Sequence, residues 1–539
     1  MREEEDENDT IGLAIAGGIL VAAAGGAATM RGFQQQTIVD VDTGEERPAM
    51  ESFDFVSGLS GGCIPTVLYT YAQNVTTNEL LDADFRLNDP SEITLEVLER
   101  VNKDERSIFD AVVNRISLKA LPAIFYGFLM GKTHKLMTIG VWKVFLKPFG
   151  IKRRMKITSD ENASQERDGF VGPRKGIKCT PLLNFIAKGM ADDNARDSID
   201  DFYQVIDKLN EKYSNAFVPV NELIDLINEV DDPDLFIPYV ASPYDVRNAM
   251  PDRGSYFINE INMNVVPIRE WSGGDHIKSI EFFLGAATNA PAMYGIKRDA
   301  SAMSKLLSNA AQRRTVQLGD GREKKTMLFV DGGFADGLGV PALVQRKVRK
   351  IIASIWPHSE ARNYCLHYEA AKGKGIDVWL AEAPSLAFGD IASYFGYYSR
   401  NIECYFKNHM FDDGPARLAQ LRKDVDALYE AGKPIVVTMK DLVTVHNPFW
   451  GIEAGMLVDL TIILWTLPKD FAEKLPIESV PPPSPSMPKC DPNTGLLNNL
   501  EFKNFPNFAG GINYQASNAI KTYLGAGSLS RKQANMSGK

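Results

Sequence analysis

The sequence predicts an α/β protein with a mostly parallel central sheet flanked by helices and with a large helical insertion. Short apolar runs alternate with helical stretches, which is typical of a sheet that helices cover on both faces. Tight glycine turns join two of these runs to the helices that follow them. A long charged stretch, roughly 75–275, separates the second strand unit from the third and predicts the insertion.

Composition limits the class of protein before any motif is considered. The 539 residues exceed what one hydrophobic core usually fills, so we expect one large elaborated domain or two closely joined ones. Hydrophobic residues (44%) and charged residues (24%) are in globular proportion. The net charge of −10 argues against a general nucleic-acid binder. Five widely spaced cysteines indicate free thiols, and we expect a cytoplasmic protein.

The N-terminal part predicts an acidic tail over 1–10 and then a first strand–turn–helix unit. A buried strand is expected over 11–16, a tight turn at Gly17-Gly18 and a helix over 20–36. The uncharged run 11–30 is long enough to cross a membrane. Because it consists mostly of Gly and Ala, we interpret it as a buried part of a soluble domain.

A second unit repeats this arrangement, and a third buried strand follows further along the chain. A strand over 53–56 leads into a turn at 58–62 and a helix over 64–72. The strand 327–330 ends on Asp331-Gly332-Gly333, and the apolar stretch 338–344 follows it. Further strands are predicted over 350–356, 376–380, 434–439 and 457–465.

The insertion contains helical stretches at 92–112 and 198–213 that we expect to form an added layer or cap. Within it, 116–156 interleaves aromatic and aliphatic residues with basic ones. This pattern is typical of a helix that lies on an anionic lipid surface. A buried cap helix with a solvated basic face is the other interpretation, and the sequence leaves both open.

The C-terminal part predicts three segments. The main domain extends over 11–475, a Pro-rich linker over 476–495, and an extension that packs on the main domain over 496–539. Six prolines in the thirteen positions 480–492 predict an extended surface connection.

The strongest local motif is Gly58-Leu59-Ser60-Gly61-Gly62. A serine on a sharp strand-to-helix turn has an exposed hydroxyl, and the turn needs small residues on either side of it. The N-terminus of the following helix adds backbone N–H groups and a positive dipole that favour an alkoxide. Ser60 is therefore the predicted nucleophile.

The base that we predict for Ser60 is Asp331. None of the six histidines lies at a strand end beside glycines, and His446 is the best of them. Asp331 closes an apolar strand and precedes Gly332 and Gly333, so its carboxylate emerges at the end of a central strand. A carboxylate in a desolvated cleft can have its pKa raised enough to accept the serine proton.

The glycine turn at Gly17-Gly18 supplies the third part of the predicted site. Acyl transfer needs backbone N–H donors aimed at the oxyanion, and Gly17, Gly18 and Ile19 are the candidates. The glycine patterns of nucleotide-binding loops are absent, as are H-E-x-x-H and C-x-x-C. We therefore predict no cofactor and no metal.

Taken in order, these three motifs resemble those of the patatin-like and cytosolic phospholipase A2 superfamily. Two more segments, 284–291 and 505–508, are similar to secondary motifs of that family. The resemblance implies a patatin-like fold and a Ser–Asp dyad that works without histidine. The family's oxyanion loop reads Gly-Gly-Gly-x-Arg, whereas Ile19 and Val21 stand at its third and fifth positions here. The missing arginine removes a charge that could hold a phosphate headgroup.

The sequence thus predicts a carboxylic-ester hydrolase of the phospholipase A2 or lipase type, which cleaves a lipid ester through an acyl-serine intermediate. The expected partners are a lipid or phospholipid substrate and a membrane surface contacted through 116–156. Gly58, Gly61, Gly62, Gly332 and Gly333 are expected to support the turns. Two alternatives remain open at this point: a lipid-binding pseudoenzyme with a weakened oxyanion loop, and an acyltransferase that uses the same dyad.

Overall fold

The fold was obtained as a computed structural model. It describes residues 10–39, 44–84, 138–163, 169–189, 237–248, 279–288, 323–355, 386–398 and 408–464, with shorter pieces elsewhere.

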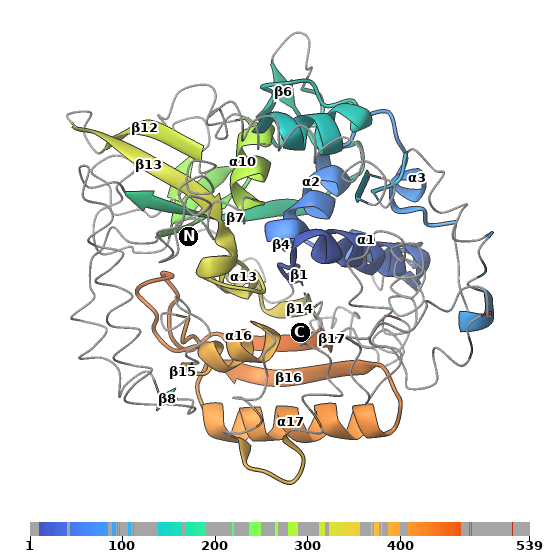
Figure 1. The fold of residues 1–539 in the computed structure, drawn as a ribbon, viewed down its shortest axis with the longest axis vertical. Coiled ribbons are helices and arrows are strands. Elements are labelled where there is room, and N and C mark those ends of the chain that lie inside the picture. The colour runs from blue at the N-terminus through green and yellow to red at the C-terminus, as the bar shows by residue number, and fades with distance from the viewer. Residues whose placement is uncertain are drawn as a thin grey trace, which may run out of the picture.

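The central feature is an 11-stranded sheet in the order β11-β10-β9-β7-β4-β1-β14-β17-β16, with the β12–β13 hairpin attached to β7. Its middle is parallel: β7, β4, β1, β14 and β17 all run the same way. Antiparallel strands extend it on both sides. The predicted α/β class is confirmed, with the parallel pairing concentrated in the middle of the sheet (Figure 1). The strands are β1 (Ile11–Ile15), β4 (Phe55–Leu59), β7 (Thr180–Gly189), β9 (Ile237–Ala241), β10 (Asp245–Asn248), β11 (Val265–Pro267), β12 (Gln312–Leu318), β13 (Glu323–Asp331), β14 (Lys350–Ile355), β16 (Ile435–Val443) and β17 (Leu457–Leu464).

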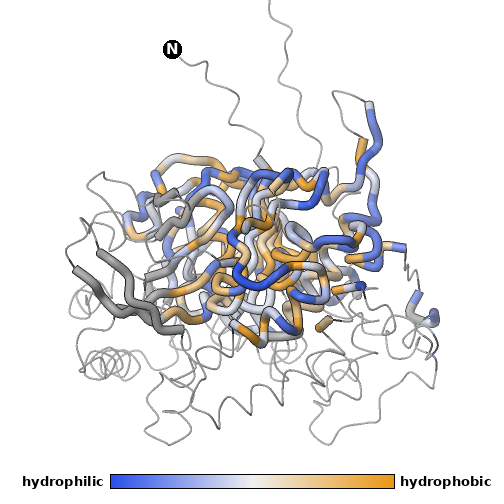
Figure 2. Tube along the Cα trace, turned by 90° about the horizontal axis from the view of Figure 1, so that it is seen from above, coloured by the Kyte–Doolittle hydropathy of each residue, from blue (hydrophilic) through white to orange (hydrophobic). Residues whose placement is uncertain are grey.

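Helices cover both faces of this sheet. In β14 the side chains alternate, so that Ile352 belongs to one buried cluster and Ile351 to another. The first cluster packs under α1 (Ile19–Gln35), α2 (Cys63–Tyr71) and α10 (Ile280–Ala287). The second packs under α13 (Val340–Val344), α16 (Leu386–Tyr394) and α17 (Gly414–Glu430). In Figure 2 the hydrophobic stretches of the trace gather in the interior of the molecule.

The smaller described elements lie around this frame. They are β2 (Thr37–Val39), β3 (Glu46–Pro48), α3 (Thr77–Leu81), β5 (Lys156–Ile157), β6 (Phe170–Val171), β8 (Val218–Pro219) and β15 (Tyr397–Tyr398).

The small residues of α1 reflect close packing inside the protein. A Cβ added at Gly26 would lie 2.7 Å from Ile15 Cγ2 and 2.9 Å from Pro65 Cγ. There is therefore no room for a side chain at this position of the helix. The helix can therefore approach both the sheet and α2 closely. None of the described helices combines the length and apolar character that a membrane crossing requires.

Most of the predicted strand and helix units are confirmed. The units beginning at β1 and β4 have the expected strand–turn–helix form, and β13, β14, β16 and β17 lie where strands were expected. The strand predicted over 376–380 is wrong, because Ile376 and Trp379 are helical and Trp379 N–H donates to the carbonyl of Gly375. A short apolar run does not by itself distinguish a strand from a buried helical turn.

The insertion differs from the expected added layer in one important respect. Four of its segments, β7, β9, β10 and β11, are strands of the central sheet, and β7 lies directly beside β4. The helical stretch predicted over 198–213 lies outside the described residues, as does most of 92–112.

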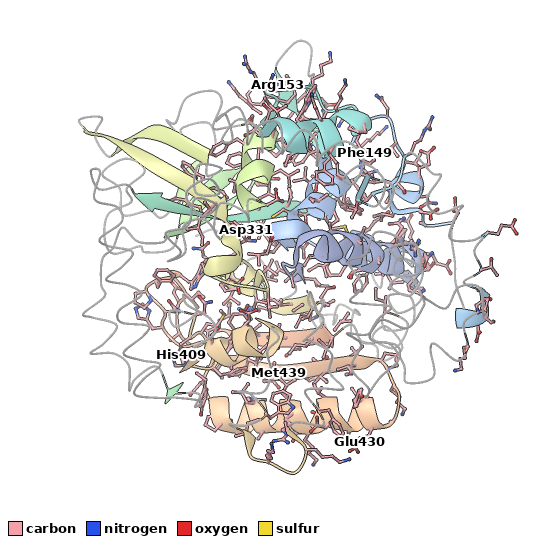
Figure 3. The ribbon with its side chains drawn as sticks, viewed as in Figure 1. Phe149, Arg153, Asp331, His409, Glu430 and Met439 are labelled. Carbon is pink, nitrogen blue, oxygen red and sulfur yellow. The ribbon has the colours of Figure 1, made fainter. Side chains whose placement is uncertain are left out.

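The described part of the basic and aromatic stretch packs into the core. Val144, Phe145, Leu146 and Phe149 are buried in the first cluster, while Lys143 and Lys147 are exposed. Figure 3 shows Arg153 at the rim of the molecule. For 138–149 this arrangement agrees with a buried helix that has a solvated basic face, while 150–155 form a turn and an irregular connection to β5. Residues 116–137 lie outside the described part, so the predicted membrane contact remains a prediction.

The predicted Pro-rich linker also lies outside the described residues. In the C-terminal extension, Ile520 is described and is buried in the first cluster.

Candidate active site

Strand β7 aligns the two parts of the candidate dyad. Leu59, the last residue of β4, pairs with Asn184, and Asp331, the last residue of β13, pairs with the next residue, Phe185. Because β4 runs parallel to β7 and β13 runs antiparallel to it, the C-terminal ends of the two strands meet head to head. Ser60 and Asp331 are therefore neighbours, although 271 positions separate them in the sequence.

Ser60 occupies a strained turn between β4 and α2. Its φ is 49°, which lies in the left-handed region, while Leu59 before it is extended. Such a backbone conformation costs on the order of 1–3 kcal/mol and persists only where the surroundings enforce it. A 3₁₀ turn over Ser60–Gly62 then continues directly into α2. This is the strand–turn–helix context that the motif predicted.

Two glycines of the motif are required by the close approach of other backbone atoms. A Cβ at Gly62 would lie 2.5 Å from the carbonyl oxygen of Ile15. A Cβ at Gly58 would lie 2.6 Å from Thr66 Oγ1 and 2.7 Å from the carbonyl oxygen of Gly62. The turn therefore folds tightly against both β1 and the first turn of α2.

The Ser60 hydroxyl donates to the Asp331 carboxylate. The distance from Ser60 Oγ to Asp331 Oδ2 is 2.5 Å, and the Gly333 N–H donates to Asp331 Oδ1 at 2.9 Å. Asp331 is 2% exposed and Ser60 7%. Burial raises the pKa of Asp331 to about 7, and the hydrogen bonds from Ser60 and Gly333 partly oppose this rise. A carboxylate with such a pKa is partly ionised at neutral pH and is a much stronger base than an exposed one.

The Asp-Gly-Gly sequence has a steric reason in this arrangement. A Cβ at Gly332 would lie 2.8 Å from the carbonyl oxygen of Asn184 on β7. A Cβ at Gly333 would lie 3.2 Å from Asp331 Oδ1. Glycine at both positions lets the chain turn away from β7 immediately after Asp331.

The glycine turn after β1 lies against Ser60, but one of its N–H groups is already used. The Gly17 N–H donates to the carbonyl of Gly337 at 2.9 Å, so it does not point to a substrate as expected. Gly17 contributes through its missing side chain, because a Cβ there would lie 3.2 Å from Ser60 Cβ. The positive φ of the turn, 145°, falls on Gly18. Ile19 is the first residue of α1, so its φ does not need to be positive.

The remaining candidates for oxyanion donors are the N–H groups at the start of α1. The first N–H groups of a helix have no acceptor within the helix and carry a partial positive charge. Gly18 is the N-cap of α1, and α1 packs against the 3₁₀ turn that contains Ser60. The N-termini of both α1 and α2 therefore lie beside Ser60.

Neither described histidine belongs to this arrangement. His446 is exposed on the connection between β16, the edge strand, and β17. His409 is half-buried beside the carbonyl of Phe411 and lies well away from Asp331 in Figure 3. Within the described ranges there is also no group of histidine, cysteine or acidic side chains that could hold a metal ion.

Two polar residues of the site were missed from the sequence. Asn184 lies on β7 and Asp336 on the loop after Asp331, and both are buried. Asn184 is the polar residue in the apolar stretch Leu182–Ile186, which is the signal that could have identified it. Asp336 lies among glycines, where an aspartate that forms a simple turn is the usual interpretation.

The fold and site define an α/β protein with a buried serine–aspartate pair. No family model and no curated protein sequence matches the chain. Among solved structures it is similar to human GIVD cytosolic phospholipase A2, with 10% identity and a TM-score of 0.39 over 98% of this chain and 61% of that one. The same human protein in complex with methyl gamma-linolenyl fluorophosphonate inhibitor and terbium chloride gives 11% identity and a TM-score of 0.34, over 98% and 60%. The chain thus spans about three fifths of the length of these structures.

Of the two secondary motifs, 505–508 lies outside the described residues. The first half of 284–291 forms the end of α10, which packs on β7 and β13.

Proposed function

We propose that this protein is a lipid acyl hydrolase of the phospholipase or lysophospholipase type that uses a Ser60–Asp331 dyad. The observation that carries the proposal is the 2.5 Å hydrogen bond from a serine on a strained strand-to-helix turn to a buried carboxylate. The choice of a lipid ester rests on the order of the three motifs along the chain.

In the first half-reaction, Asp331 accepts the hydroxyl proton of Ser60 while Oγ attacks the ester carbonyl. The resulting oxyanion is held by N–H groups at the start of α1, from Gly18 and Ile19, and the N-terminal dipole of α2 adds to its stabilisation. When the tetrahedral intermediate collapses, the leaving alcohol takes the proton from Asp331. The acyl chain then remains as an ester on Ser60.

In the second half-reaction, Asp331 takes a proton from water, and the hydroxide attacks the acyl-serine. Collapse of this second intermediate releases the fatty acid, and the proton returns from Asp331 to Ser60. Asp331 can serve in both steps because burial raises its pKa to about 7, close to working pH. An exposed aspartate, with a pKa near 4, would accept these protons poorly.

A fluorophosphonate probe tests this proposal, because it reacts with activated serines. We expect mass spectrometry to place the probe on Ser60 of the wild type. Ser60→Ala should lose both labelling and esterase turnover, and Asp331→Asn should lower both at least about 100-fold. Ser52→Ala is the matched control, since Ser52 is a buried serine that precedes β4, and it should behave as wild type. Labelling that persists in Ser60→Ala would overturn the assignment.

Two observations favour the second candidate, a lipid-binding pseudoenzyme. The Gly17 N–H is bonded to Gly337, and Val21 stands where the resembling family has arginine. Both features weaken the oxyanion side of the site. Turnover of a short-chain ester that disappears in Ser60→Ala excludes this candidate. Binding of a fatty acid without any turnover favours it.

A further inference from the structure

The Asn184 side chain holds the strand that carries the nucleophile. Asn184 is 6% exposed and pairs with Leu59 across the β4–β7 ladder. Its Nδ2 donates to the carbonyl of Gly58 at 2.7 Å and to Ser57 Oγ at 2.9 Å. An asparagine NH₂ group has two protons, and both acceptors lie within three residues of Ser60.

The hydrogen bonds continue from Ser57 to the loop that follows the base. Ser57 Oγ donates its one proton to the carbonyl of Gly339 at 2.8 Å. The Gly339 N–H donates to Asp336 Oδ2, and Asp336 Oδ1 accepts from the Leu338 N–H and the Tyr394 hydroxyl. A single buried chain therefore extends from Asn184 through Ser57, Gly339 and Asp336 to Tyr394, and we call it the loop clamp.

The loop in question, 332–339, also contacts the third part of the site. Its Gly337 carbonyl accepts the Gly17 N–H, and its Ala335 carbonyl accepts from Asn408 Nδ2 at 2.7 Å. The fit is close: Gly339 has a φ of 81°, and a Cβ there would lie 2.8 Å from Ser57 Oγ. Displacement of this loop would therefore move the base and the glycine turn together.

We propose that Asn184 and Asp336 are positioning residues, which act through the loop clamp to hold Asp331 at hydrogen-bonding distance from Ser60. The inference rests on the proposed function and deepens it. Buried polar chains of this kind fix one arrangement, because any other leaves groups unsatisfied in a medium of low dielectric. In this proposal neither residue contacts the reacting ester. Their effect comes from geometry, and a misplacement of about 1 Å can cost on the order of 100-fold in rate.

The test is the rate of fluorophosphonate labelling as a function of pH, resolved into kinact and KI. The principal variant is Asn184→Leu, which is neutral, has the same number of side-chain heavy atoms with the same branching, and removes both donors. We expect kinact to fall roughly 10- to 100-fold with KI almost unchanged. We also expect the midpoint of the pH profile to rise, because the Ser60 hydrogen bond that lowers the pKa of Asp331 is weakened.

The choice of variant keeps the pH profile interpretable. Cys63 interacts with Asp331, but burial raises the pKa of its thiol above the usual range, so it stays neutral. Asp336 is itself a titrating group, with a pKa that burial raises to about 6. Asn184→Leu retains both groups, and the change in midpoint then reports on Asp331.

Two further variants make the test decisive. Thr461→Val is the control, since it breaks the partly buried Thr438–Thr461 hydrogen bond of the same sheet, outside the loop clamp, and should keep the wild-type kinact and midpoint. Tyr394→Phe removes only the hydroxyl that donates to Asp336 at the end of the loop clamp. It should lower kinact and raise the midpoint of the pH profile, as Asn184→Leu does, but by smaller amounts. It also provides the test if Asn184→Leu does not fold.

Two outcomes overturn the inference: a folded Asn184→Leu or Tyr394→Phe with wild-type kinact, or a loss that Thr461→Val reproduces without a shift of midpoint. Failure of the proposed function looks different, because the wild type itself would then leave Ser60 unlabelled.

Discussion

Replacement of Asp331 by asparagine should lower activity at least about 100-fold and yet stabilise the folded protein at alkaline pH. Burial raises the pKa of Asp331 from 3.8 to about 7. The folded state therefore binds this proton more tightly than the unfolded state. The stabilisation from protonation is complete below pH 3.8 and is lost as the pH rises through about 7. At 1.36 kcal/mol per pKa unit, ionised Asp331 costs about 4 kcal/mol above that pH.

Asparagine retains the shape of the side chain and removes this cost. Its amide oxygen can still accept from Gly333, and its NH₂ group can donate to Ser60, so few hydrogen bonds are lost. We expect the melting temperature of Asp331→Asn to exceed that of the wild type at pH 8 and to match it near pH 4. A thermal scan across this range measures the difference.

The exposed Asp413→Asn is the control, and its melting temperature should follow that of the wild type at every pH. If the gain in Asp331→Asn were equal at pH 4 and pH 8, the stabilisation would not come from removal of a buried charge. The account of Asp331 as a desolvated base would then be refuted.

Three other predictions follow from the same structure. Because the base must be ionised, esterase turnover should rise with pH through about 7, and the rate at pH 8 should be about ten times that at pH 6; a flat profile of kcat/KM would contradict this. Gly62→Ala should abolish labelling or folding, since its Cβ would lie 2.5 Å from a carbonyl oxygen, whereas Gly375→Ala, which has open space around it, should have no effect. Arg174→Ala should lower the free energy of unfolding by about 2 kcal/mol, because the guanidinium donates twice to the carbonyl of Tyr69 near the end of α2; unchanged chemical denaturation would count against this role.

Local sequence patterns were sufficient to predict most of the frame. The strand–turn–helix units at Gly17-Gly18 and Ser60 could be predicted because tight turns restrict which residues fit within a few positions. The strand predicted from the apolar run at 376–380 was wrong, because Ile376 and Trp379 are helical. It also left the stretch 116–156 with two interpretations, because periodicity describes a helix but not the surface that the helix faces.

By itself, the sequence determined the chemical groups of this protein: a serine on a tight turn, an aspartate at a strand end and a glycine turn before a helix. Only the tertiary structure decided that the serine and aspartate meet, because that depends on the register of two distant strands along β7. It also decided that the Gly17 N–H is bonded to Gly337 and that Asn184 donates to the carbonyl of Gly58 in the strand that precedes Ser60. Pairing between strands far apart in the chain is set by the packing of the whole sheet, and no local pattern of residues specifies it.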